Sequence, residues 1–139
     1  MKPSLKPGLG QTRKIKVDEP RVISFMGDDC RVYATPRIIS DVEYTCREFL
    51  LAHLDPGEDS VGTKVNWEHV GPALLGAEVT LSIKVLQVDG RRVVFEAKVE
   101  DGADAVAHGT HERFIVEVQK LRERLLKKGT QLTQEILLE

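Results

Sequence analysis

The sequence has few cysteines, few aromatic side chains and little net charge. Its two cysteines, Cys30 and Cys46, form no CxxC pair, so it contains neither a disulfide framework nor a cysteine-rich metal site. We expect both to be reduced thiols of a cytoplasmic protein. A net charge of −2 argues against strong sequence-independent binding to nucleic acid.

Long apolar runs are also missing. No stretch approaches the roughly 20 apolar residues that a membrane-spanning helix needs, and the N-terminus lacks the apolar core of a signal peptide. We therefore expect no membrane partner. The length of 139 residues fits one domain that buries its own core. Residues 1–12 are basic and interrupted by Pro and Gly, so we expect a loosely held lead-in.

One apolar helix is predicted from Thr35 to about Leu54. Thr35 is a favourable N-cap, and Pro36 suits the first helical position. Apolar residues then follow at spacings of three and four, namely Ile38, Ile39, Val42, Cys46, Phe49 and Leu50. The turn sequence Asp55-Pro56-Gly57 ends the pattern.

Apolar residues elsewhere recur at every second position, which predicts strands. One short strand, 13–17, precedes the helix, and four follow it at 61–69, 79–85, 93–99 and 106–118. Asp89-Gly90 and Asp101-Gly102 are hairpin turn signals between them. A short helix over 119–128 is expected to stop at Gly129, and the last ten residues are expected to be disordered. The chain thus divides into the lead-in, a domain over 13–120 and a C-terminal segment over 121–139.

Strands joined by tight turns favour an antiparallel sheet. A single helix that is more apolar than a surface helix should be wrapped by that sheet. This α+β layout is the hot-dog fold, in which an antiparallel sheet surrounds one long central helix.

Glu43 interrupts the apolar stripe of the predicted helix. It lies four residues after Ile39 and three before Cys46, which places it on their face. A buried carboxylate without partners costs several kcal/mol, so it should be neutralised, paired or used. The alternative is that Glu43 lies at the edge of the stripe and reaches solvent.

Histidines and a threonine are further candidates. His69 ends the strand face formed by Val61, Thr63, Val65 and Trp67, and is either structural or catalytic. Thr35 is explained by capping alone. His108 and His111 would point to opposite faces of a strand, so we expect no metal site there.

Several stretches together resemble the fluoroacetyl-CoA thioesterase family of hot-dog proteins. The resemblance extends from about residue 12 to residue 120. It rests on Val32-Tyr33-Ala34-Thr35, Glu43 eight residues later, Leu54-Asp55-Pro56-Gly57-Glu58, Val61-Gly62-Thr63, His69 and Gly109-Thr110-His111-Glu112-Arg113.

The resemblance implies a homodimeric thioesterase that hydrolyses a short-chain acyl-CoA to free acid and CoA without a cofactor or metal. It places Thr35, Glu43 and His69 at the catalytic positions, and Gly62 and Arg113 at positions that contact the acyl group. One departure concerns the lid, where the fluoroacetyl enzyme carries phenylalanines. The corresponding stretch here, Met26 to Cys30, has only Phe25 nearby.

Two other functions fit the same fold. A hot-dog hydratase would use an Asp-His pair in a motif that this sequence does not contain. A non-catalytic module that binds acyl-CoA or another small ligand would need none of the three catalytic groups.

The spacing within the helix also bears on the site. Thr35 and Glu43 are eight residues apart, or about 12 Å along a continuous helix. Because hot-dog proteins commonly pair two sheets edge to edge, we expect the catalytic groups to come from two subunits.

Overall fold

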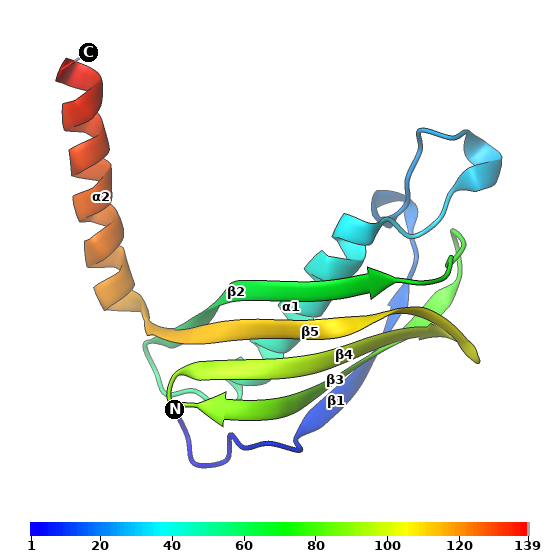
Figure 1. The fold of residues 1–139 in the computed structure, drawn as a ribbon, viewed down its shortest axis with the longest axis horizontal. Helices are drawn as coiled ribbons and strands as arrows, with labels where there is room; N and C mark the ends of the chain where they lie inside the picture. Colours follow the sequence, from blue (N-terminus) through cyan, green and yellow to red (C-terminus); the bar gives the residue numbers. More distant parts are fainter. Residues whose placement is uncertain (139) are drawn as a thin grey trace.

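The structure is a computed structural model that describes residues 1–138. Its helices and strands are arranged as a curved sheet with one helix packed against its concave face and another projecting from one end (Figure 1). In chain order they are β1 (Gly10–Lys16), η1 (Glu19–Arg21), η2 (Asp28–Cys30), α1 (Thr35–Leu51), β2 (Glu58–His69), β3 (Glu78–Asp89), β4 (Arg92–Asp101), β5 (Asp104–Glu117) and α2 (Val118–Leu138).

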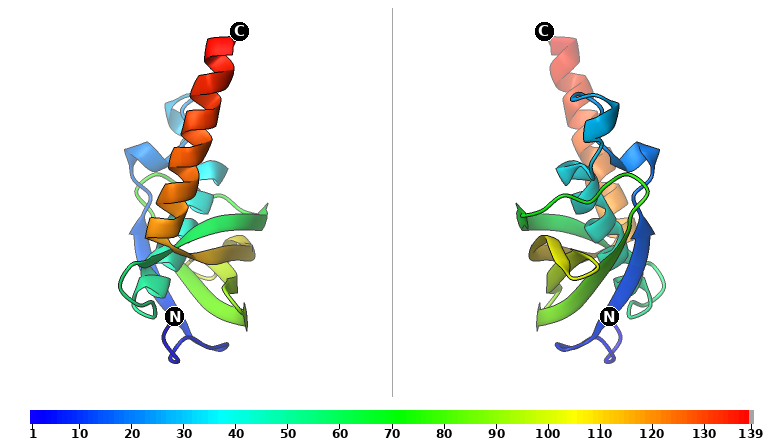
Figure 2. Two further views of the ribbon diagram at one scale, coloured as in Figure 1. Left: turned by 90° about the vertical axis from the view of Figure 1, so that its left-hand side faces the viewer. Right: turned by 90° about the vertical axis from the view of Figure 1, so that its right-hand side faces the viewer.

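The sheet has five strands in the order β1-β3-β4-β5-β2, and every neighbouring pair is antiparallel. Two tight hairpins join β3 to β4 and β4 to β5. Gly90 (φ 58°) and Gly102 (φ 60°) supply the left-handed conformations that these turns require. The sheet curves around α1 in the end-on views (Figure 2). The predicted α+β hot-dog fold is therefore confirmed, with β1 and β2 as its free edges.

The core lies between α1 and the concave face of the sheet. Helical positions at spacings of four, Ile38, Val42, Cys46 and Leu50, are each 2% exposed or less. They face apolar residues of the sheet that are fully buried, including Leu81, Phe95 and Ile115. Burying apolar surface contributes roughly 25 cal/mol per Å², so this interface fixes how α1 lies on the sheet.

The C-terminal helix differs from its prediction. Instead of stopping at Gly129, α2 continues to Leu138. Gly129 does not adopt the left-handed conformation that would end a helix, and a helical glycine costs only about 1 kcal/mol relative to alanine. Two threonine hydroxyls also bond back to helix carbonyls, Thr130 to Leu126 and Thr133 to Gly129.

The N-terminal residues are attached to the domain rather than loosely held. Leu5 is buried in the core, the Lys2 amide donates to the His53 carbonyl, and β1 begins at Gly10. The sequence did not predict these contacts, because they join segments about fifty residues apart. Among the helices of residues 1–138, none combines the length and hydropathy that a bilayer span requires.

Candidate functional site

The candidate residues fall into two groups along α1. The first, here called the helix-start pair, is Thr35 and His69. The second, here called the carboxylate cluster, consists of Glu43, Ser60, Gly62, His111 and Arg113. Each group combines residues from α1 and from the sheet edge that contains β2.

The helix-start pair joins the first residue of α1 to the last residue of β2. Thr35 Oγ1 lies 2.6 Å from His69 Nδ1, and the Thr35 side chain is exposed. The prediction that Thr35 is the N-cap is wrong by one residue: Ala34 occupies that position, and its carbonyl accepts from the amides of Arg37 and Ile38. The Thr35 hydroxyl is therefore free of capping and bonds to an imidazole instead.

A charged network holds the chain just before Thr35. Arg21 donates from Nε and Nη2 to the Asp41 carboxylate at 2.9 and 3.1 Å, and the Tyr33 hydroxyl also donates to Asp41. Burial, followed by the Asp41 carboxylate, holds the pKa of Tyr33 well above its usual range, so the hydroxyl stays a donor. The Ala34 amide donates to the Arg21 carbonyl at 2.8 Å. These contacts, which the sequence pattern did not reveal, fix the start of α1.

Glu43 is half-buried and faces a pocket of about 330 Å³. The pocket is lined by Ser40, Glu43, Tyr44, Arg47, Ser60, Val61, Gly62 and Arg113. Within residues 1–138 the ion pairs of α1 are made by Asp41, Arg47 and Glu48, not by Glu43. A carboxylate beside the core thus faces a cavity instead of an ion-pair partner.

Gly62 allows Glu43 to lie this close to the sheet. A Cβ atom at Gly62 would be 2.7 Å from Glu43 Oε1 and 3.1 Å from His111 Cε1. Glycine is thus the residue that leaves room for the carboxylate against β2.

Arg113 is almost fully buried beside this carboxylate and is held from two sides. It donates from Nε to Ser60 Oγ at 2.7 Å and from Nη2 to the Ser60 carbonyl at 2.8 Å. Its Nη1 lies 3.1 Å from His111 Nε2. These bonds use one hydrogen on each nitrogen, and the guanidinium has five, so donors remain for a ligand.

His111 is neutral in this arrangement. The Lys64 carbonyl, 3.0 Å away, only accepts, so Nδ1 carries the proton and Nε2 accepts from Arg113. Burial, with a smaller effect from the charge of Arg113, lowers the pKa of His111 below its ordinary value. His111 lies in the stretch from Gly109 to Arg113 that resembles the family, but nothing in the sequence indicated that it would hold Arg113.

A bulge in β2 brings both groups to the same face of the sheet. Gly62 pairs with Arg113 and Lys64 with Glu112, which leaves Thr63 as an extra residue. The predicted single face from Val61 to His69 is therefore wrong at its start, since Val61 pairs with exposed Phe114 on the outer face. Without the bulge, Gly62 and His69 would lie on opposite faces, being seven residues apart.

The structure brings Thr35 to His69, and Glu43 to Gly62 and Arg113, but it keeps the two groups apart within one chain. They are separated by eight residues of a continuous helix, about 12 Å of rise.

His108 is exposed beside Glu68 and His111 is buried, which confirms that these two histidines lie on opposite faces of β5. No group of residues suited to a metal occurs in residues 1–138.

The two cysteines differ in environment. Cys30 is exposed, and Cys46 is buried beside the carboxylate cluster. Burial raises the pKa of Cys46 to about 12, so its thiol stays neutral and unreactive.

Comparison with known proteins gives the same picture from sequence and from structure. A family model described as fluoroacetyl-CoA-specific thioesterase matches residues 17–119. The fluoroacetyl-CoA thioesterase of Streptantibioticus cattleyicolor is 31% identical over 97 residues, which is 70% of each chain.

Solved structures include a fluoroacetyl-CoA thioesterase that is 25% identical, with a TM-score of 0.81 over 90% of this chain and 98% of that one. A hot-dog-like protein from Thermanaerovibrio acidaminovorans is 27% identical, with a TM-score of 0.81 over 88% of this chain and 91% of that one. A thioesterase superfamily member from Thermus thermophilus, 23% identical, shares the fold with a TM-score of 0.82 over 99% of both chains.

Proposed function

The chain belongs to the fluoroacetyl-CoA-specific thioesterase family, and from that premise we propose that it hydrolyses a short-chain acyl-CoA to free acid and CoA. Thr35, Glu43 and His69 are the proposed catalytic residues. The observation that carries the proposal is the Glu43 carboxylate, which faces a pocket beside Gly62 and Arg113 without an ion-pair partner in residues 1–138.

Glu43 acts on the thioester carbonyl carbon in this proposal. Direct attack forms a mixed anhydride, releases CoA as its thiolate and leaves the anhydride to be hydrolysed by water. Alternatively, Glu43 takes a proton from a water molecule, and the hydroxide attacks the same carbon. Both routes need a carboxylate that is ionised and free of other partners.

The helix-start pair serves the carbonyl oxygen and the leaving group. At the N-terminus of α1, Pro36 has no amide hydrogen and the Arg37 and Ile38 amides donate to Ala34, so the Thr35 amide and the positive end of the helix dipole are what can stabilise a developing oxyanion. His69 is within hydrogen-bond distance of Thr35, and an imidazole exchanges protons readily near neutral pH. The pair is thus suited to orienting the carbonyl and to protonating the departing thiolate.

A homodimer would unite the two groups. β2 is a long edge strand with partly exposed apolar residues, Val61 and Val65 among them, and such an edge favours pairing with another strand. In an antiparallel β2–β2 pair related by a two-fold axis, the start of one β2 meets the end of the other. The carboxylate cluster of one subunit then lies near the helix-start pair of its partner, in two equivalent sites.

Thiol release from a panel of short, branched and aryl acyl-CoA esters tests the function. We expect release from at least one short ester, and we expect EDTA to leave the rate unchanged, since the proposed groups need no metal. A folded protein that binds acyl-CoA but releases no thiol from any ester would instead be a non-catalytic binding module.

A further inference from the structure

Little of the helix α2 packs against the rest of the described residues of its own subunit. None of its described residues is buried, although it is 21 residues long, or about 31 Å. It leaves the end of β5 and projects beyond the free edge at β2 (Figures 1 and 2). Helices gain most of their stability from packing an apolar face, so this helix lacks the contact that would stabilise it.

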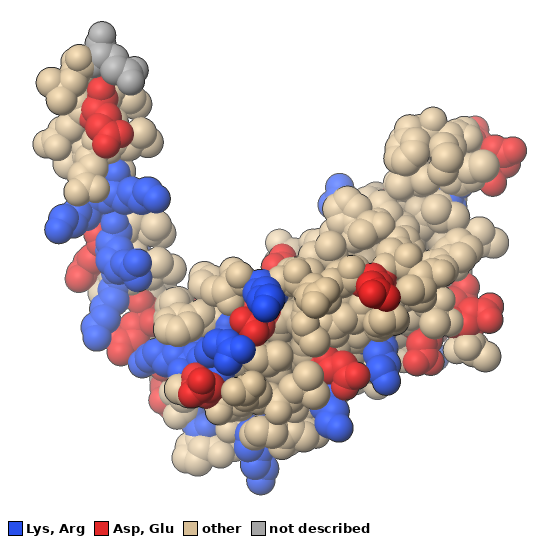
Figure 3. Space-filling model, viewed as in Figure 1, with Lys and Arg blue, Asp and Glu red and all other residues tan. Residues whose placement is uncertain are grey.

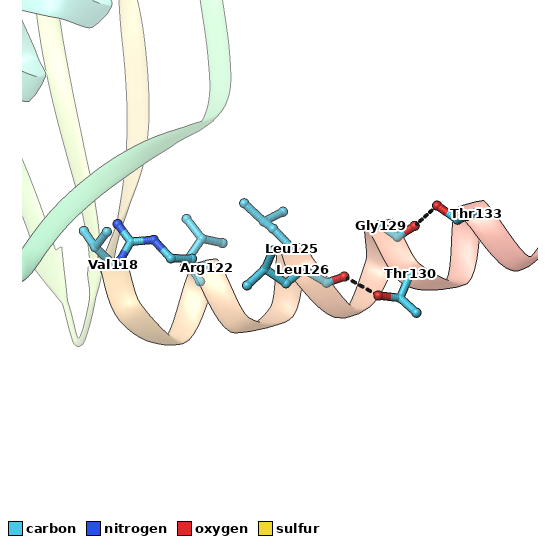
Figure 4. Close-up of a pocket in the computed structure, with 8 residues that line it drawn as sticks. Val118, Arg122, Leu125, Leu126, Gly129, Thr130 and Thr133 are labelled. Atoms are coloured by element: carbon cyan, nitrogen blue, oxygen red, sulfur yellow. Dashed lines mark hydrogen bonds between the residues drawn. The ribbon is translucent and has the colours of Figure 1, made fainter.

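One side of α2 is apolar. Val118 and Leu125 project from the same side in the close-up, with the Arg122 side chain between them and Gly129 further along (Figure 4). Positions at spacings of three and four continue this stripe, namely Val118, Leu121, Leu125, Gly129, Leu132 and Ile136. The helix is also basic, because five Lys and Arg against two Glu give a net charge of +3 over the described residues of α2.

A second exposed apolar surface lies at the opposite end of the domain. We call it the apolar end, and it consists of Phe25 (80% exposed), Met26 (55%), Val70 (52%), Leu74 (64%) and Leu75 (37%). A β-bridge between Val32 and Leu74 and a hydrogen bond from the Leu75 amide to the Arg31 carbonyl join its two loops.

Charge makes the two surfaces complementary. Asp28 and Asp29 follow Phe25 and Met26 at the tip of their loop, whereas Lys and Arg residues crowd the first half of α2. The space-filling view shows basic groups along one arm of a wide hollow and acidic groups at the tip of the other (Figure 3).

The strand register indicates which surfaces meet. α2 follows Glu117, which pairs with Glu58 at the start of β2, whereas the apolar end adjoins His69 at the finish of β2. The twelve residues of β2 span about 40 Å, so the two surfaces are too far apart to meet within one chain. Antiparallel β2–β2 pairing brings the start of one strand to the finish of the other, and with it α2 to the partner's apolar end.

We propose that, in the dimer on which the proposed function also depends, the apolar stripe of α2 packs on the apolar end of the partner subunit. The basic flanks of the helix then lie near Asp28 and Asp29 of the partner subunit. Because the apolar end adjoins the helix-start pair, α2 forms one wall of the shared site and holds the partner's residues 25–30 in place over it.

Matched charge substitutions on α2 test this contact. Leu125→Asp places a carboxylate in the apolar stripe, and Gln134→Asp, nine residues later, places the same group on the opposite side of the helix. We expect Leu125→Asp to raise amide hydrogen exchange in residues 23–31 and 70–76 by a factor of about 10 or more, as for a segment released to local opening. Gln134→Asp should leave that exchange unchanged.

Cys30 supplies a second measurement, because the buried Cys46 does not react. Its labelling by a thiol reagent should be slow in the wild-type dimer and faster in Leu125→Asp. Unchanged exchange and labelling in a Leu125→Asp protein that sediments as a dimer would overturn the contact and leave the shared catalytic site standing. An active wild-type protein that sediments as a monomer would overturn both.

Discussion

Glu43 is the residue that folding alone explains least. Glu43 lies on α1 beside the buried residues Val42 and Cys46, yet its carboxylate faces a pocket. Gly62 leaves the space for it, and Arg113 lies beside it without forming an ion pair. Each of these features keeps the carboxylate available to a ligand.

Replacing Glu43 should therefore separate activity from stability. Glu43→Gln keeps the shape but removes the charge, so we expect kcat/KM to fall by a factor on the order of 10² or more. A carboxylate beside apolar neighbours is destabilised by desolvation, so Tm should stay the same or rise. Glu48→Gln is the control, since Glu48 is exposed on the same helix and makes only a 3.5 Å pair with Arg13. A Glu43→Gln protein that unfolds more easily but keeps full specific activity would assign Glu43 a structural role.

His111 should make stability depend on pH. Burial lowers its folded-state pKa below the ordinary 6.5, so the unfolded chain binds more protons than the folded one in the interval between the two values. The contribution of His111 is thus complete above about pH 6.5 and is lost as the pH falls through the folded-state pKa.

Urea unfolding at pH 7.5 and pH 5 measures this effect in three proteins. The wild type should lose stability at the lower pH, and His111→Gln should lose less of it, because glutamine does not titrate. His108→Gln removes an exposed histidine from the opposite face of the same strand, so its loss should match that of the wild type. Equal losses in all three would show that His111 does not carry the effect.

At the scale of elements, the sequence predicted the order of the strands and the central helix along the chain, because the spacing of their apolar residues is regular. It also placed Thr35 and Glu43 on one helix and Arg113 on the last strand. It did not predict the bulge at Thr63 or the bonds from Ser60 and His111 to Arg113, because these depend on pairing between strands rather than on spacing within one. The prediction that Gly129 ends the C-terminal helix is wrong because the local sequence does not determine the backbone conformation of this glycine.

The segment that precedes the helix-start pair in the sequence, residues 25–30, leads to a prediction about selectivity. Phe25 is the aromatic residue closest in sequence to residues 26–30, and it is 80% exposed. Without the lid phenylalanines of the fluoroacetyl enzyme, this protein should discriminate little between fluoroacetyl-CoA and acetyl-CoA. The ratio of the two kcat/KM values measures this, and Phe25→Ala should leave the ratio nearly unchanged. A strong preference for the fluorinated ester that disappears in Phe25→Ala would make Phe25 the selective group.

At the scale of the whole molecule, each group of candidate residues is assembled within one subunit, but the two groups stay apart in it. The pocket at Glu43 and the pair at Thr35 lie at different levels of the same helix, and β2 runs past both. Two chains paired through β2 would supply each site with both groups.

Mixed dimers test this division directly. Glu43→Gln and His69→Ala should each be inactive alone, because every site lacks one group. After subunit exchange, a hybrid dimer would contain one site with both substitutions and one with neither, so mixing should recover part of the wild-type rate. Mass spectrometry of the mixture confirms exchange. Hybrids that form but stay inactive would mean that Glu43 and His69 of each site come from the same chain.

The bulge at Thr63 also determines how the length of this strand can vary. Substituting Thr63 changes an exposed side chain whose hydroxyl makes one 3.2 Å bond to the Glu112 carbonyl, so most replacements should be tolerated. Deleting Thr63 would leave six steps between Gly62 and His69, an even number that keeps both residues on the same face of a regular strand, so the strand could close without the bulge and still point both toward α1. Inserting one residue between Thr63 and His69 would instead add a step to a strand that already carries its extra residue, and would turn Gly62 or His69 away from α1. We therefore expect this strand to tolerate the loss of one residue better than the gain of one.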